Sequence, residues 1–279
     1  MNLDALLAQA PRFPQRIVCL TEETTETLYR IGCGELVVGV SGFTVRPPEA
    51  RKKPKVSSFL DANYERIVEL KPDLVLGFSD LQATLGAELA KRGVPVVLFN
   101  QRSIAEILQT IRVIGALVGH ADESIALATE LEANVRAVAA KAQTLPRRPR
   151  VFFEEWHEPL ISGIRWCSEL IEVCGGEDVC IETRSQQGAK GRIFEPAEVA
   201  RRRPEVVIAS WCGRKVKREK IINRPGWSEV PAVRDDQLYE IKSPTILQPG
   251  PAALTDGIAQ MARIITAVAH GEHLPSRLA

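Results

Sequence analysis

The sequence predicts an α/β protein of two lobes joined by a single long helix, and three observations support this fold class. Strand-like and helix-like segments alternate over residues 16–100, and they alternate again after residue 150. Residues 103–143 between them show only helical spacing. A similar helix–Pro–acid–strand unit occurs in both halves. Such alternation is typical of parallel sheets covered by helices on both faces.

The first lobe opens with a strand, a helix and a strand over residues 16–40. RIVCL and LVVGVS are apolar and rich in β-branched residues, whereas TEETTETLYRIG has helical spacing and begins at a threonine. Gly32 and Gly34 end this helix. The next predicted elements are the helix ANYERIVELK, the strand DLVLGF, the helix QATLGAELAKRG and the strand PVVLFN.

Helices alone follow the first lobe. SIAEILQTIRVIGALVG is followed by DESIALATELEANVRAVAAKAQ, a long helix without internal Pro or Gly that ends at TLPRRPR. The alternation restarts with the strand RVFFEEW and runs to a last helix, ALTDGIAQMARIITAVAHG. We therefore expect an N-terminal lobe over 1–120, a connecting helix over 121–145 and a C-terminal lobe over 146–279.

The two halves share a repeated unit. YERIVELKPDLVLGF and PAEVARRRPEVVIAS both read as helix, proline, acid, apolar strand and small polar loop, and Pro72 aligns with Pro204 and Asp73 with Glu205 without a gap. Two similar lobes would explain this match. The alternative is that helix–Pro–strand units recur by chance in any α/β protein.

Charge and composition exclude several function classes. The chain has 36 Lys and Arg against 35 Asp and Glu, so no net field favours nucleic acid or an anionic membrane. No apolar run is long enough for a transmembrane helix. The start, MNLDALLAQAPRFPQRIV, lacks the basic residues and continuous apolar stretch of a secretory signal. As written, the chain is expected in the cytoplasm, unless a signal has been trimmed.

The cysteines form no CxxC pair, which removes the usual zinc and redox signatures. Buried free thiols are one interpretation, and a metal site from the closely spaced Cys167, Cys174 and Cys180 is the other. The six positions are Cys19, Cys33, Cys167, Cys174, Cys180 and Cys212.

An ordered series of motifs resembles the helical-backbone class of ABC-importer substrate-binding proteins, and most closely the periplasmic cobalamin-binding component. The series covers roughly Arg16 to Ala269 and comprises RIVCLTEETTETLYRIG, VVGVSGF with RPPEA, KVSSFLDANYERIVELKPDLVL and PLISGIRWCSELIEVCGGEDV. The resemblance implies two Rossmann-like lobes joined by one long helix (class III periplasmic-binding-protein-like), with a ligand held between them. It also implies a periplasmic location if a signal has been trimmed.

Aromatic residues of the first lobe fall where ligands bind. Phe43 follows VVGVSG, Phe59 precedes the ANYER helix, and Phe78 ends DLVLGF. Open α/β sheets bind ligands beyond the carboxyl ends of their strands. The three positions match aromatic cleft positions of the cobalamin-binding family. Loop aromatics that only cap the core are the alternative.

The second lobe places more rings at its strand ends. Trp156 and His157 end RVFFEEW, Arg165 and Trp166 follow the SGI turn, and Trp211 follows VVIAS. Large flat chelates need aromatic walls with a few polar groups, so we expect these side chains to form a stacking surface. His157 is either an axial ligand to iron or cobalt or a hydrogen-bonding group.

An enzymatic interpretation is weaker. Glu154, Glu155 and Glu158 suggest a carboxylate site with His157, but strand alternation sends Glu154 and Trp156 to one face and Glu155 and His157 to the other. GxSxG, GxxxxGK and HExxH are absent. We therefore expect no catalytic residues, no intrinsic cofactor and no protein-bound metal.

The late segment IKSPTILQPGPAAL contains no aromatic residue where cobalamin binders place one. The ligand therefore stays open between cobalamin, haem and a ferric siderophore. A smaller or more anionic chelate would use Lys242, Arg46 and Arg165.

The family docks onto an ABC permease through an acidic residue on each lobe. Glu65 matches the first position, whereas the second is Ala197, with Glu198 beside it. An ordinary exposed glutamate is the alternative for Glu65.

Three functions remain open. The first is a monomeric substrate-binding protein for an ABC importer that holds a metal chelate, with no nucleic-acid partner. The second is a cytoplasmic ligand sensor, carrier or metallocofactor-handling protein on the same fold, without a permease. The third is an enzyme of the nitrogenase-like metal-cluster type, against which the absence of paired cysteine motifs counts.

Overall fold

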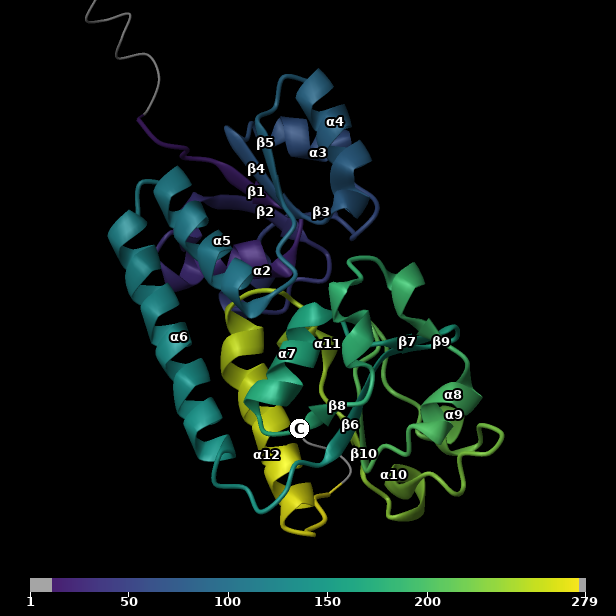
Figure 1. The fold of residues 1–279 in the computed structure, drawn as a ribbon. Helices are drawn as coiled ribbons and strands as arrows, with labels where there is room; N and C mark the ends of the chain where they lie inside the picture. Colours follow the sequence, from purple (N-terminus) through teal and green to yellow (C-terminus); the bar gives the residue numbers. More distant parts are fainter. Residues whose placement is uncertain (1–11, 276–279) are drawn as a thin grey trace, which may run out of the picture. The chain divides into compact units, whose positions relative to one another are not determined.

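The computed structural model describes residues 12–275, which form two compact units (Figure 1). Within this range, unit 1 consists of 12–101 and 108–129, and unit 2 consists of 102–107 and 130–275. The start of the chain, on which the expectation about a signal segment rests, lies outside the described residues. The two helices α5 (Ile104–Leu117) and α6 (Ala121–Ala142) contribute residues to both units. The division into 1–120, 121–145 and 146–279 stays a proposal.

Unit 1 contains a five-stranded parallel sheet of order β3-β2-β1-β4-β5. Every residue of the neighbouring strands β1 and β4 is buried, as expected where helices cover both faces of a sheet. Helices α3 and α4 cover one face and α2 the other (Figure 1). The elements are β1 (Ile17–Cys19), α2 (Glu22–Arg30), β2 (Val37–Ser41), β3 (Lys55–Ser57), α3 (Tyr64–Glu69), β4 (Leu74–Phe78), α4 (Ala83–Lys91) and β5 (Val96–Phe99).

Unit 2 contains a mixed sheet of order β11-β10-β6-β7-β9, with β8 paired to the start of β6. Strands β6, β10 and β11 are parallel, and β7 and β9 form antiparallel pairs. The elements are β6 (Arg150–His157), β7 (Leu160–Ser162), α7 (Arg165–Val173), β8 (Glu177–Asp178), β9 (Ile193–Phe194), α8 (Pro196–Arg201), β10 (Val206–Ala209), α9 (Glu219–Ile222), α10 (Pro231–Arg234), β11 (Leu238–Glu240), α11 (Ser243–Ile246) and α12 (Ile258–Ala269).

The hairpin of β6 and β7 was not expected from the sequence. Strand β7 has only three residues, and it follows β6 after Glu158 and Pro159, so too few residues alternate for a strand to be recognised. The hairpin leaves β10 as the parallel neighbour of β6. Residues at the carboxyl ends of β6 and β10 are thereby brought to the same edge of the sheet.

The repeat seen in the sequence has the same backbone geometry in both units. Lys71 and Arg203, which precede the aligned prolines, both lie in the left-handed region, with φ of 48° and 47°. The carboxylate of the acid after each proline accepts hydrogen bonds from backbone N–H groups. These N–H groups lie just before, or at the start of, the first strand of the same sheet. Asp73 accepts from Gln15 (2.7 Å) and Arg16 (2.8 Å). Glu205 accepts from Arg150 (2.9 Å). The same turn, with the same kind of hydrogen bond to the first strand, therefore occurs once in each unit.

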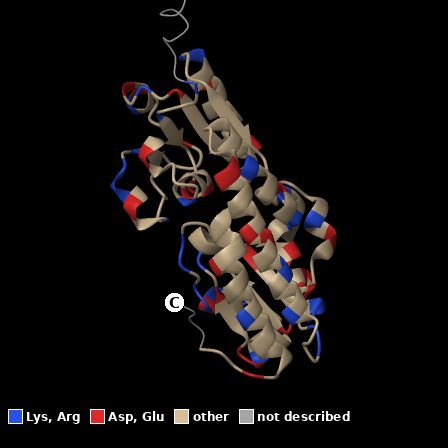
Figure 2. Ribbon diagram, turned by 90° about the vertical axis from the view of Figure 1, so that its left-hand side faces the viewer, with Lys and Arg blue, Asp and Glu red and all other residues tan. Residues whose placement is uncertain are grey.

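Charged residues are interspersed over the helices of both units, in keeping with the near-balanced composition (Figure 2). Among the described residues, no helix combines the length and the apolar character that crossing a membrane requires.

Candidate functional site

Three aromatic side chains of unit 2 form one continuous surface, which we call the ring surface: Trp156, His157 and Trp211. Trp156 and His157 end β6, and Trp211 follows β10 by two residues. The His157 and Trp211 rings are stacked, with centroids 4.2 Å apart and an interplanar angle of 26°. The Trp156 ring centroid lies 5.1 Å from that of His157. The sequence prediction that these residues come together is matched by this arrangement.

The imidazole of His157 is held neutral within the ring surface. Its Nε2 lies 2.7 Å from Nζ of Lys220, and a lysine ammonium has only donors, so Nε2 accepts the hydrogen bond. Burial, and then the charge of Lys220, lower the pKa of His157. Since Nε2 is occupied, His157 orients a neighbouring cation in this conformation. It does not present Nε2 to a metal.

A buried ion pair supports the ring surface from below. Glu154 is 0% exposed, and Arg224 donates two hydrogen bonds to its carboxylate at 2.7 and 2.9 Å. Trp211 donates its indole N–H to the same carboxylate at 3.1 Å. The three bonds satisfy the buried charge and fix the orientation of the Trp211 ring.

The neighbouring carboxylates do not form a common site. Glu155 pairs with Arg192 (2.7 Å) and accepts a hydrogen bond from the backbone N–H of Ile164, whereas Glu154 pairs with Arg224.

The prediction that Trp156 and His157 point to opposite faces was too simple. Between Glu154 and Trp156 the register to β7 shifts by one residue, and such a bulge interrupts the alternation of side chains. The two rings therefore contact each other.

Trp166 is not part of the ring surface. Its side chain is 2% exposed and its indole N–H is donated to the carbonyl of Ile246 at 2.8 Å, so it packs inside unit 2. Arg165 begins α7 and pairs with Glu169 at 2.8 Å. Lys242 is exposed and follows β11, the parallel neighbour of β10, which places it at the same sheet edge as Trp211.

In unit 1 the predicted aromatic residues differ in exposure. Phe43 is 50% exposed just after β2, Phe59 is partly buried, and Phe78 is buried at the end of β4. Only Phe43 therefore offers a largely free ring in this conformation. Arg46 pairs with Glu26 of α2 at 3.2 Å.

An acidic cluster follows β1, at the point where the strand order of unit 1 reverses between β1 and β4. Glu23 is 2% exposed and accepts a hydrogen bond from Thr21. Burial, and then the neighbouring carboxylates, raise the pKa of Glu22 to about 8. Burial also raises the pKa of Glu23 to about 7. The sequence shows these acids in TEETTET, but their burial was not expected.

Because the pKa values of Glu22 and Glu23 are raised, we predict that the protein loses stability as the pH rises. The folded state retains protons that the unfolded state releases above pH 4.5, so the free energy of unfolding falls between pH 4.5 and about 8. We expect a loss on the order of 2–4 kcal/mol across this window, measured by urea denaturation. The variant E22Q/E23Q should flatten the slope. An unchanged slope in that variant would exclude the two acids as its source.

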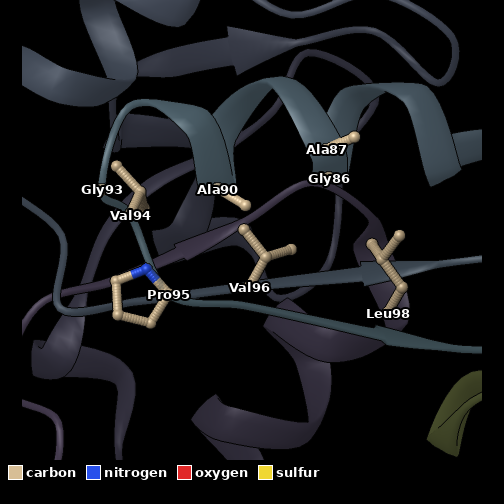
Figure 3. A pocket seen from close by; sticks show the side chains of 8 residues that line it. All are labelled: Gly86, Ala87, Ala90, Gly93, Val94, Pro95, Val96 and Leu98. Carbon is tan, nitrogen blue, oxygen red and sulfur yellow. The ribbon is translucent and has the colours of Figure 1, made fainter.

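Two hollows of the surface have different linings. In unit 1, a hollow of ≈ 600 Å³ between α4 and β5 is lined only by glycine and apolar residues, and Val96 and Leu98 point towards the helix (Figure 3). In unit 2, a hollow of ≈ 560 Å³ adjoins the ring surface through His157 and Lys220. Its lining mixes apolar residues such as Leu160 and Phe194 with charged ones. Only the second hollow offers polar groups to a ligand.

The cysteines do not gather as ligands. Within residues 12–275, no group of three His, Cys, Asp or Glu side chains is placed to hold a metal. Burial raises the pKa of Cys19 and Cys174 to about 12, which keeps them as thiols.

The two acids proposed for docking occupy different surroundings. Glu65 is exposed in the first turn of α3. Glu198 lies on α8 and pairs with Arg202 at 2.7 Å.

Sequence reasoning missed the cations that contact the ring surface. Lys220 lies in α9, and Arg224 follows this helix. The Arg214 guanidinium carbon lies 5.4 Å from the centroid of the Trp156 ring. The basic run GRKVKREK shortly after the strand VVIAS was the available signal.

Comparison with known proteins agrees with this architecture. The family model described as periplasmic binding protein matches residues 17–245. An uncharacterised ABC transporter substrate-binding lipoprotein of Bacillus subtilis is 27% identical over 261 residues, 90% of this chain and 80% of that protein. The vitamin B12-binding protein of Pectobacterium atrosepticum is 27% identical over 229 residues, 79% of this chain and 80% of that protein.

Solved structures share the fold. The periplasmic haem-binding protein of Roseiflexus superposes with a TM-score of 0.77 at 24% identity, covering 90% of this chain and 99% of that one. The periplasmic vitamin B12-binding protein of Vibrio cholerae gives 0.73 at 22% identity, covering 93% and 99%. The resemblance drawn from the sequence motifs is thereby confirmed, and the chain belongs to the periplasmic binding protein family.

Proposed function

We propose that this protein binds a metal chelate with a flat face, of the corrinoid, haem or ferric-siderophore kind, and delivers it to an ABC permease. The ring surface carries this proposal. At the carboxyl edge of β6 and β10, the partly exposed rings of Trp156 and His157 contact each other, and the buried ring of Trp211 stacks on His157. These rings offer an aromatic platform where α/β proteins bind ligands.

The chemistry of the ring surface fits a chelate that brings its own metal. Flat macrocycles gain from stacking on indole and imidazole, and a few polar groups then fix their orientation. Because Nε2 of His157 is held by Lys220, we infer that the metal is coordinated by the chelate itself. The relatives support this class, since some of them are named vitamin B12-binding and others haem-binding proteins.

A binding titration tests the proposal directly. Cyanocobalamin, haem and a ferric siderophore are each added to the purified protein, and calorimetry and absorption spectra are recorded. We expect at least one of these chelates to bind with a dissociation constant well below that of unrelated planar molecules. No binding of any chelate would reject the function.

We propose that Glu65 contributes to docking on the permease. It is exposed, and no ion-pair partner is found for it in the described part of the chain. Glu198 is a weaker candidate because Arg202 already neutralises it. Reversal of the charge in E65R should lower permease-stimulated ATP hydrolysis severalfold without changing chelate binding. E35R, another exposed glutamate reversed in unit 1, serves as the control, and equal effects of the two variants would exclude a specific role for Glu65.

A further inference from the structure

A basic segment borders the ring surface. It begins four residues after the end of β10, spans residues 213–220 and contains a single acid, Glu219. Its positively charged residues are Arg214, Lys215, Lys217, Arg218 and Lys220. Five of these eight residues are therefore positively charged, although the total charge of the chain is nearly balanced.

Two of these cations contact the rings themselves. Arg214 lies over the Trp156 ring, with its guanidinium carbon 5.4 Å from the ring centroid. Lys220 donates to His157. A guanidinium that contacts an indole ring still has N–H donors available to an acceptor. The ring surface is therefore flanked by donors at Trp156 and at His157.

The charges of this segment are mostly not neutralised by the protein. Arg218 pairs with Asp236, and the nearby Arg224 pairs with Glu154. In contrast, neither Arg214 nor Lys220 forms an ion pair among residues 12–275, and both are exposed, although Glu158, Glu195 and Glu219 also line the hollow beside Lys220.

The local field is positive as a result. Desolvation and the charges of Lys220, Arg224 and Arg214 lower the pKa of His157, and they outweigh the opposing effect of Glu158. A cation is repelled from such a place, whereas an anionic group is attracted to it.

We propose that the chelate carries anionic arms, carboxylates or deprotonated catecholates, and that Arg214 and Lys220 receive them while its flat face lies on the rings. This inference rests on the proposed function and narrows its substrate class. Nucleic acid or an anionic membrane would call for a broad basic face, but acidic and basic residues are intermixed over the helices of both units (Figure 2).

Matched pairs of ligands test the charge preference. Cyanocobalamin is compared with its monocarboxylic acid, in which one propionamide has been hydrolysed, and haem is compared with its dimethyl ester in the same detergent. Within each pair the flat face is unchanged and only the charge of the arms differs. We expect the anionic member of at least one pair to bind about fivefold to tenfold more tightly, with a preference that shrinks as salt is added.

Variants connect the preference to the two cations. R214Q/K220Q should abolish the preference, so that the two members of each pair bind this variant with equal affinity. K141Q is the control, because it removes one exposed charge at the end of α6. The chain continues from there to the start of β6, whereas the ring surface lies at the end of β6. We expect K141Q to bind both members of each pair as the unaltered protein does.

The outcomes separate this inference from the proposed function. If both members of each pair bind equally, or if the preference survives in R214Q/K220Q, the assignment of an anionic ligand is overturned while chelate binding stands. If no member of either pair binds and the ferric siderophore does not bind either, chelate binding itself is overturned.

Discussion

Replacement of Arg224 by methionine is expected to lower the free energy of unfolding by about 3–5 kcal/mol, because it leaves the carboxylate of Glu154 buried without its charge partner. Glu154 is 0% exposed, and the side chain of Arg224 is 8% exposed, so water does not replace the lost bonds. The measurement is urea denaturation at neutral pH, followed by circular dichroism.

Two controls interpret this result. The double variant E154L/R224M removes both charges and should recover much of the loss, since replacing a buried ion pair by apolar groups is often nearly neutral. R136M breaks the exposed pair of Arg136 and Glu132 on α6 and should cost less than about 1 kcal/mol. A loss in R224M as small as that in R136M would show that the buried pair contributes little.

Removal of the Trp156 ring is expected to weaken chelate binding about thirtyfold, or about 2 kcal/mol, as for a central aromatic residue of a binding surface. Trp156 is a better test than Trp211, because Trp211 is 2% exposed and its removal would also disturb the core. Calorimetry on W156A with the chelate that binds the unaltered protein gives the ratio.

A matched control exists in unit 1. Arg92 lies over the ring of Tyr64, with its guanidinium carbon 4.6 Å from the centroid. This pair has the same kind of contact as Arg214 and Trp156 but does not belong to the ring surface. Y64A should bind the chelate as the unaltered protein does. Unaltered affinity in W156A, or an equal loss in both variants, would contradict a binding role for Trp156.

The regular elements could be predicted from the sequence because their signals are local. Val206–Ala209 is a continuous apolar strand, and α6 has helical spacing without a breaker over 22 residues. Strand β7 was missed because three residues give too short a period to read. The presence of Trp156 and Trp211 at one edge of the sheet was predicted because parallel strands end at the same edge. The ring of His157 contacts both of them.

The remainder of the site depends on contacts that no local pattern encodes. Glu154 and Arg224 are separated by 70 positions, and only the fold brings them together. Trp166 was expected at the site, yet it belongs to the buried stripe of α7 with Leu170 and Ile171. That stripe has the helical spacing i, i+4, i+5, and this could have shown that the ring faces inward.

The turn that occurs in each unit before β4 and before β10 holds the first strand of that unit's own sheet. Lys71 and Arg203 take the same backbone conformation, and Asp73 and Glu205 each anchor the first strand of their own sheet. Each half therefore sets its strand register without help from the other. Loops beyond the sheet of unit 2, including those with Trp211 and Arg214, can therefore change in sequence while the strand register of unit 1 stays the same.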